Sequence, residues 1–325
     1  MQLCDCKIST LKWLDEDKNV MKDLISIVIP FYNGNKHLNN LKKIINYNYL
    51  ALKDEADLEV ILINDSPWID IDINRFRGSE YSVRSYSHIK NMGIHQARVT
   101  GIEHADGNFI FMLDQDDDIT SDCIISLYNY FDNATDIVFG NGVFESKDGL
   151  KLILNNYCRA LAAKNKKYYY FLGNLLSSPG QCLIRKTAFP SFWLENIVKS
   201  NCADDLFLWC MLMNKNNVKY CNKIVYIHKH TGENFSLDLE NGYKSDREIW
   251  EYLRKSESCD KINLKIFDLR CKRNMARLSH QRLDVKCKVY NLFEVMIKIA
   301  MVLFSILYKG IGKCVPSLED YKERN

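Results

Sequence analysis

The 325-residue chain lacks several features that would place it in a particular class of protein. None of its twelve cysteines forms a C-x-x-C pair, so we expect no structural zinc site and thiols that stay reduced in the cytosol. Residues 1–20 hold no apolar segment of the kind that secretory signals carry, so we expect no export. The net charge is only +3, which gives no electrostatic reason to expect a nucleic-acid partner.

A long uncharged apolar run is also missing from the C-terminal segment 289–313. Its longest uncharged stretch, residues 299–308, has ten residues, whereas a helix that spans a bilayer needs about 20. Lys298 and Lys309 flank this stretch. Two interpretations stay open for the segment: an amphipathic helix that lies in the headgroup region of a membrane, or a terminal helix packed on the protein.

The composition and periodicity of the chain are those of a globular α/β protein. Apolar residues make up 47% and charged residues 26%, which allows a sizeable core. Apolar, β-branched runs alternate with segments of helical spacing, and this pattern predicts a mostly parallel sheet flanked by helices. The predicted strands are residues 24–32, 58–65, 81–88, 108–114 and 136–141, and the predicted helices are residues 35–52, 93–105 and 121–131.

The second half of the chain is less regular. Its pattern predicts a loop and short strand at residues 177–184, a helix that begins with acidic residues within 202–214, and a strand that leads into a polar loop at 218–236. From about residue 240 onward the pattern is helical and rich in Lys and Arg. We therefore divide the chain into an N-terminal extension (1–24), a main α/β domain (25–238) and a helical C-terminal extension (239–325), the last a candidate for membrane association.

Acidic side chains follow the fourth predicted strand in the stretch FIFMLDQDDDIT. Within five positions this stretch places Asp114, Asp116, Asp117 and Asp118. In parallel sheets, ligands bind beyond the carboxyl ends of the strands, where Asn33 and Asp65 also fall. A D-x-D pair can bind Mg²⁺ or Mn²⁺ together with substrate phosphates, but an acidic turn that caps the next helix explains the stretch nearly as well.

The motifs around these residues, taken in order, carry a family resemblance. A first strand ends in P-x-Y-N at residues 30–33, and a second ends in Asn64-Asp65. They are followed by N-x-G-x-x-x-A-R-x-x-G-x-x-x-A-x-G at residues 91–107 and by L-D-x-D-D at residues 113–117. Over residues 24–235 the chain resembles the nucleotide-sugar domain of GT-A glycosyltransferases of family 2, which implies a GT-A fold. One departure is Pro67, which stands where the family often continues D-G-S after its second strand.

The resemblance implies a role for each matching residue. Tyr32 and Pro30 would line the nucleobase pocket, Asp65 would hydrogen-bond the base, Arg98 would lie near the base or diphosphate, and Asp114 would approach the ribose or sugar. Structural alternatives stay open: Tyr32 as a wall of the core, Asp65 as a turn former, and Arg98 as the partner of a nearby carboxylate. The full set assigned to substrate binding is Pro30, Tyr32, Asn33, Asp65, Asn91, Arg98, Asp114, Gln115, Gln181 and Asp204.

The resemblance also assigns the metal and the general base. The cofactor would be Mn²⁺ or Mg²⁺, ligated by Asp116 and by His230, which aligns better than His228 with the family histidine. Asp205, in the stretch NCADDLFLW, aligns with the family's general base, and its neighbour Asp204 would orient the acceptor. The alternative for this acidic pair is simple stabilisation of a helix N-terminus.

The implied activity is a metal-dependent, inverting transfer of a sugar from a nucleotide-sugar, by preference a UDP-sugar, to an acceptor hydroxyl. The acceptor would be a glycan or lipid-linked saccharide, and the protein would be cytoplasmic, at the inner face of the cell membrane, with peripheral contact through its C-terminal region. The alternatives are a donor of the dTDP-rhamnose type and an inactive module that only binds. A nucleotidyltransferase is disfavoured because no Gly-rich phosphate loop precedes a helix.

Overall fold

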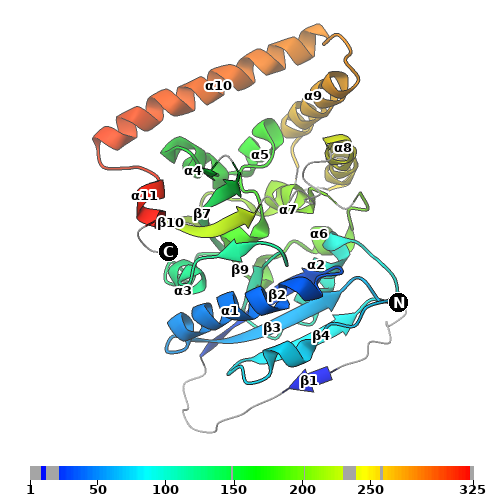
Figure 1. Ribbon diagram of the computed structural model, residues 1–325. Helices are drawn as coiled ribbons and strands as arrows, with labels where there is room; N and C mark the ends of the chain where they lie inside the picture. Colours follow the sequence, from blue (N-terminus) through cyan, green and yellow to red (C-terminus); the bar gives the residue numbers. More distant parts are fainter. Residues whose placement is uncertain are drawn as a thin grey trace.

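The strands of the protein join in a single curled sheet (Figure 1). The computed structural model describes residues 9–11, 22–147, 149–200, 202–229, 239–256 and 259–322. Within these ranges the sheet has ten strands in the order β1-β4-β3-β2-β5-β9-β7-β10-β6, with β8 paired to β7. The strands are β1 Ser9–Leu11, β2 Asp23–Phe31, β3 Ala56–Asn64, β4 Ser82–Ser87, β5 Phe109–Met112, β6 Asp118–Ile119, β7 Ile137–Ser146, β8 Gly149–Leu152, β9 Cys182–Arg185 and β10 Val218–Lys229.

The first half of the chain forms the parallel part of the sheet. Strand β2 pairs in parallel with β3 and β5, and β3 pairs in parallel with β4. Strands β2, β3 and β5 are buried over nearly their whole length, which explains why their sequences read as continuous apolar runs. The predicted strands and helices of this half are confirmed, and the helices are α1 Leu38–Leu52, α2 Ile94–Glu103 and α3 Cys123–Tyr128.

Strand β9 makes the sheet mixed in its second half. It runs antiparallel to both β5 and β7, whereas β7 and β10 are parallel to each other. Because β9 begins at the edge where β5 ends, the loop that precedes it, including the short helix η3 Pro179–Gln181, reaches the carboxyl ends of the parallel strands. The expectation of a mostly parallel sheet therefore holds for β2, β3, β4 and β5, and for the pair β7 and β10. The strands β1, β6, β8 and β9 depart from it, because each pairs antiparallel with its neighbours.

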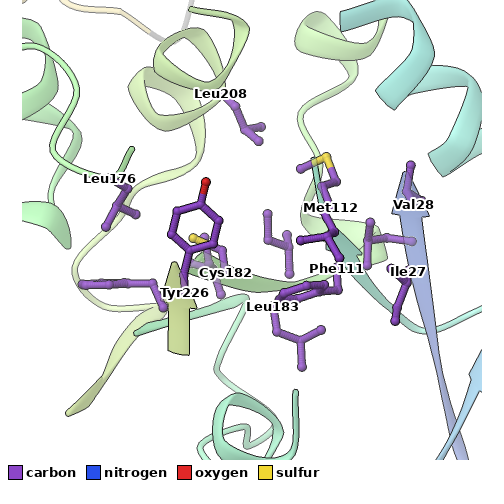
Figure 2. Packing of buried hydrophobic residues seen from close by; sticks show 14 of the residues in the cluster. Ile27, Val28, Phe111, Met112, Leu176, Cys182, Leu183, Leu208 and Tyr226 are labelled. Carbon is purple, nitrogen blue, oxygen red and sulfur yellow. The ribbon is translucent and has the colours of Figure 1, made fainter. Parts of the chain in front are cut away.

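Side chains from four strands and one helix pack into the apolar cluster shown in Figure 2. Val28 of β2 and Met112 of β5 lie on one side, Tyr226 of β10 lies on the other, and Leu183 of β9 lies between them. Leu208 of α7 (Asp204–Leu212) reaches the same cluster. All five side chains are at most 1% exposed. Burial of this face holds the first turn of α7, with its two acids, in a fixed position over the sheet.

The N-terminal extension and the helices around the second half complete the fold. Within residues 1–24, expected to be an irregular or partly helical extension, Ser9–Leu11 forms a strand antiparallel to β4, and most of the remainder lies outside the described residues. The other helices and helical turns are η1 Asn35–His37, η2 Ile73–Phe76, α4 Tyr157–Ala163, α5 Lys166–Leu172, η4 Lys186–Ala188, α6 Ser191–Glu195, α8 Leu239–Lys255, α9 Lys261–Leu278, α10 Val285–Gly310 and α11 Leu318–Lys322. The expected helical C-terminal extension is confirmed.

The C-terminal helices are fastened to the main domain by a buried arginine. Arg270 of α9 donates to the main-chain carbonyl of Tyr169 in α5 (2.5 Å) and to the carboxylate of Asp246 in α8 (3.1 Å). Helix α10 then runs across α4 and α9, on the far side of the molecule from β1 and β4 (Figure 1). Among the described helices, only α10 is long and apolar enough, by length and composition, to cross a membrane.

Candidate active site

The acidic turn after β5 is held by side chains from two other parts of the chain, α1 and β10. Asp117 accepts a hydrogen bond from the Tyr226 hydroxyl and lies 3.2 Å from Nδ1 of His228, both on β10. Asp118 accepts a hydrogen bond from the side-chain amide of Asn40 on α1 (2.5 Å). Burial alone would lower the pKa of His228, but the hydrogen bond and the charge of Asp117 outweigh it and raise that pKa. When it is protonated, His228 offsets part of the charge in this turn.

Asp116 is the carboxylate in this turn that forms no hydrogen bond or ion pair with any described side chain. Burial, followed by the charges of Asp117 and Asp114, raises its pKa to about 6. A main-chain hydrogen bond and the charge of His228 lower that pKa, but they are outweighed. A partly buried carboxylate without a side-chain partner, beside two others, is the arrangement that a hard divalent cation would stabilise.

Arg98 on α2 joins the acidic turn to the start of α7. Its guanidinium donates to Asp114 (2.6 Å) and to both carboxylate oxygens of Asp204 (2.7 and 2.8 Å). Ser178, from the loop before β9, also donates to Asp114 (3.2 Å). Burial by itself would lower the pKa of Arg98, but the two carboxylates raise it above its ordinary value. The guanidinium is therefore always charged and holds acids from two distant segments together.

Asp205 lies next to this bridge, in a buried position at the first turn of α7. The side-chain amide of Asn174 donates to its Oδ2 (2.5 Å), and the main-chain N–H of Leu206 donates to its Oδ1 (2.7 Å). Burial, followed by the charge of Asp204, raises the pKa of Asp205 to about 7. The residue before the pair, Ala203, has φ 58° and ψ 20°, a left-handed conformation that is strained for a residue with a Cβ and that recurs at functional sites.

The carboxylate of Asp65, directly after β3, holds the loop that leads into the N-terminus of α2. It accepts hydrogen bonds from the main-chain N–H groups of Met92 (2.6 Å) and Gly93 (2.8 Å) and from Nδ1 of His88 (2.8 Å). The side chain of Asn91 also accepts from Gly93 (3.0 Å). The structure thus gives Asp65 a loop-forming role, and its contact with a nucleobase, like that of Asn91 with a substrate, stays a prediction.

Exposed aromatic side chains lie beyond the ends of β2 and β3. Tyr32 is 41% exposed and Trp68 is 59% exposed, and their rings meet edge to face with centroids 5.8 Å apart. Trp68 donates from Nε1 to the side chain of Asn33 (3.0 Å), and Gln115 hydrogen-bonds both the main-chain N–H and the carbonyl of Tyr32 (2.9 Å each). Pro67 occupies the second position of a turn closed from Ile69 to Ser66 (3.0 Å), which suits its fixed φ.

Trp68 had no role in the sequence prediction. A tryptophan close after the second strand-end motif was the available signal, because its ring offers a large apolar surface with a polar N–H for a ligand to contact. Asn174 was also missed, and its sequence offers no comparable signal.

Pro30 and Gln181 lie inside the protein, next to the site. Pro30 is a buried residue of β2, paired with Ile63. Gln181 is fully buried, and its amide accepts from Ser177 N–H (2.8 Å) and donates to the Gly140 carbonyl (3.2 Å). Both residues are covered by the surrounding protein, and direct contact of either with a substrate stays a prediction.

The metal site predicted at Asp116 and His230 is only partly described. His230 lies outside the described residues. Within the described part of the chain, no group of three or more His, Cys, Asp or Glu side chains is arranged to hold a metal ion by itself. Asp116, with which no described side chain pairs, nevertheless fits a cation of the Mg²⁺ type, which usually takes one or two carboxylates from the protein and other oxygens from a substrate diphosphate.

A family-wide sequence model described as "Glycosyl transferase family 2" matches residues 26–191, which is half of the chain. The chain belongs to glycosyl transferase family 2. The matched region contains the strand ends, Arg98 and the acidic turn, whereas Asp204 and Asp205 lie beyond it. The resemblance inferred from the motifs is thereby confirmed.

Curated glycosyltransferases are similar to a part of the chain. An uncharacterised glycosyltransferase of Haemophilus influenzae is 32% identical over 136 residues, 40% of this chain and 52% of the relative. Glycosyltransferase GlyG of Streptococcus pneumoniae is 29% identical over 40% of this chain and 42% of its own length. A cholesterol galactosyltransferase of Borreliella burgdorferi is 31% identical over 34% and 30%. The matches thus span about half or less of the length of these relatives.

Solved structures of a glycosyltransferase share the fold of the chain. TarS residues 1–349 of S. aureus in complex with UDP-GlcNAc aligns with a TM-score of 0.56 and 14% identity, over 79% of this chain and 73% of that fragment. The complex of the same fragment with UDP gives a TM-score of 0.53 and 17% identity, over 79% and 71%. The expected GT-A fold is confirmed by this similarity.

Proposed function

We propose that the chain transfers a sugar from a UDP-sugar to an acceptor hydroxyl by a single displacement with inversion at the anomeric carbon. The observation that carries this proposal is the Arg98 bridge, which holds Asp114 from the acidic turn and Asp204 from α7 around one guanidinium, with Asp205 beside them. Two parts of the protein that family resemblance assigns to donor and acceptor thus meet at one place. The TarS complexes with UDP and UDP-GlcNAc support a UDP-sugar as the donor.

Asp205 is the proposed general base. A base works best when its pKa lies near the working pH, and burial next to Asp204 raises the pKa of Asp205 to about 7. The hydrogen bond from Asn174 to Oδ2 fixes the orientation of the carboxylate. In the proposed step the carboxylate removes the proton of the acceptor hydroxyl while that oxygen forms the new bond to the anomeric carbon and the nucleoside diphosphate leaves.

The donor would lie along the ends of β2, β3 and β5. Tyr32 and Trp68 offer exposed aromatic surface on which a base can stack. Asp116 would hold Mn²⁺ or Mg²⁺, because burial and the charges of its acidic neighbours act on it and no described side chain pairs with it. When bound, the cation would neutralise charge on the departing diphosphate.

The proposed acceptor is a glycan or a lipid-linked saccharide, in the cytoplasm at the inner face of the cell membrane. The abundance of Lys and Arg from residue 240 onward supports this location, since basic residues favour anionic headgroups. A donor of the dTDP-rhamnose type and a module that binds without turnover are the competing functions.

A nucleotide-release assay tests the proposal. Purified protein is incubated with UDP-, GDP- and dTDP-sugars, with and without Mn²⁺, and the released nucleotide is measured. We expect release from a UDP-sugar only, and a loss of about 10²- to 10⁴-fold in Asp205→Asn, whereas the exposed control Asp54→Asn keeps full activity. Release from dTDP-rhamnose alone would establish the alternative donor, and binding of UDP without release from any donor would establish the binding module.

A further inference from the structure

Helix α10 presents an apolar face that no described part of the protein covers. The helix is 26 residues long. Its outer face carries large apolar side chains, each more than half exposed, at helical spacing: Leu292, Met296, Ile299, Leu303, Ile306 and Leu307. Contiguous exposed apolar surface of this size marks an interaction site.

The opposite face of α10 is firmly packed, so the helix is not a detached arm. The Tyr290 hydroxyl donates to the main-chain carbonyl of Phe171 in α5, and Glu294 is buried in a salt bridge with Arg273 of α9. Near the other end, the Ser305 hydroxyl accepts a hydrogen bond from the main chain at the start of α4 (3.0 Å). The exposed face therefore has a fixed direction relative to the catalytic domain.

The chain returns to the same domain after α10, and this decides how the helix can meet a membrane. Leu318 and Tyr321 of α11 pack against Val143 of β7 and Ile227 of β10. At about 1.5 Å per residue the helix is roughly 39 Å long, enough to cross a bilayer. With both of its ends fastened to one folded body, it cannot cross and must lie along the surface.

The charges around α10 indicate the chemistry of the partner. Residues 261–313 contain twelve Lys and Arg but only three Asp and Glu. Within residues 285–313 the single acid is Glu294, which is buried, while Lys286, Lys288, Lys309 and Lys313 are exposed. An apolar face between exposed lysines is the pattern of a helix that lies in the headgroup region of an anionic bilayer. A second copy of α10 would instead bring two sets of lysines together without acids to pair with them.

We propose that α10 binds in the plane of an anionic lipid surface through its outer apolar face, with the neighbouring lysines on the headgroups. The inference adds an attachment mode to the proposed function, and the binding itself does not depend on the chemistry at Asp205. An acceptor carried by a lipid would then be confined to the surface on which the enzyme lies.

Vesicle co-sedimentation of the full chain, without any sugar donor, tests the inference. We expect binding to vesicles of phosphatidylcholine with about one-third phosphatidylglycerol, weaker binding to pure phosphatidylcholine, and a loss of binding as salt is raised. The double variant Ile299→Gln with Leu303→Gln should bind about tenfold more weakly or worse. The control Leu50→Gln with Ile89→Gln changes two apolar side chains elsewhere that are at least as exposed, and it should bind like the original chain.

Circular dichroism of the two variants establishes that both are folded, so a loss of binding can be assigned to the surface. Light scattering of the chain in solution tests whether a second copy of the chain binds the apolar face of α10 instead. The inference would be overturned if the chain did not bind anionic vesicles. It would also be overturned if the chain formed a dimer that Ile299→Gln with Leu303→Gln dissociates while vesicle binding stays unchanged. Because no donor is present, either result leaves the proposed sugar transfer to be judged by its own assay.

Discussion

Replacement of Arg98 by Gln should damage stability and activity together, because Arg98 is the cation shared by Asp114 and Asp204. The guanidinium and both of these contacts are largely buried: the side chains of Arg98 and Asp204 are each 4% exposed, and that of Asp114 is 22% exposed. In Arg98→Gln two carboxylates remain in place without their counter-charge. Loss of one partner from a buried ion pair costs about 3–5 kcal/mol of unfolding free energy, and we expect a loss in this range at pH 7.

The charge of Arg98 also acts on the pH dependence of catalysis. The charge of Arg98 lowers the pKa of Asp205, which is about 7 in the intact protein, so its removal should move the acidic limb of kcat/KM to higher pH.

Chemical denaturation and pH-rate profiles of a small set of variants measure these effects. Arg98→Gln is compared with Asp204→Asn and with the double variant, which should recover part of the stability because it removes one uncompensated charge. Arg75→Gln is the control, since the Arg75–Asp72 pair (2.9 Å) is exposed and should contribute less than about 1 kcal/mol. Unchanged stability in Arg98→Gln, or an acidic limb that stays in place, would refute the reasoning.

Three further outcomes are expected. In the intact enzyme, kcat/KM should rise with pH through about 7 and level off above it, because Asp205 must lose its proton to act as a base; a flat profile between pH 5.5 and 8.5 would contradict this. Asp116→Asn should abolish the stimulation of nucleotide release by Mn²⁺ while the chain stays folded, and a metal titration that matches the unchanged chain would remove Asp116 from the metal site. Gly107→Ala should lose about 1–3 kcal/mol of stability in denaturation, because a Cβ there would lie 2.6 Å from the Leu24 carbonyl, whereas Gly242→Ala, with no atom within 4 Å, should not.

Much of the fold could be predicted because its signals are local. Strands β2, β3 and β5 are buried on both faces, so their apolar runs identify them without knowledge of any partner. Strand β9 is different, since a four-residue apolar run does not reveal its direction, which depends on where the chain returns to the sheet.

The acidic residues of the candidate site could be predicted from the sequence, but most of the residues that contact them could not. Asp114, Asp116 and Asp205 were expected from motifs, and the structure places Asp114 and Asp205 around Arg98 and Asp204. Asn174 and His228 contact the acids from loops and strands far along the chain. No pattern in the sequence links such residues, because their contacts exist only once α7 and β10 pack on the sheet.

The sequence by itself determined the family, the strand–helix alternation and the collection of acids at the strand ends, since these depend on periodicity and on motifs within short stretches. Tertiary structure alone decided which acids are compensated. Arg98 and Asp204 are 106 residues apart in the chain, and their charges interact strongly only because packing removes both from water. The same holds for α10: its sequence left open a helix in the headgroup region of a membrane or a terminal helix packed on the protein. Only the structure shows that one face of α10 packs on α4 and α9 while the other is exposed.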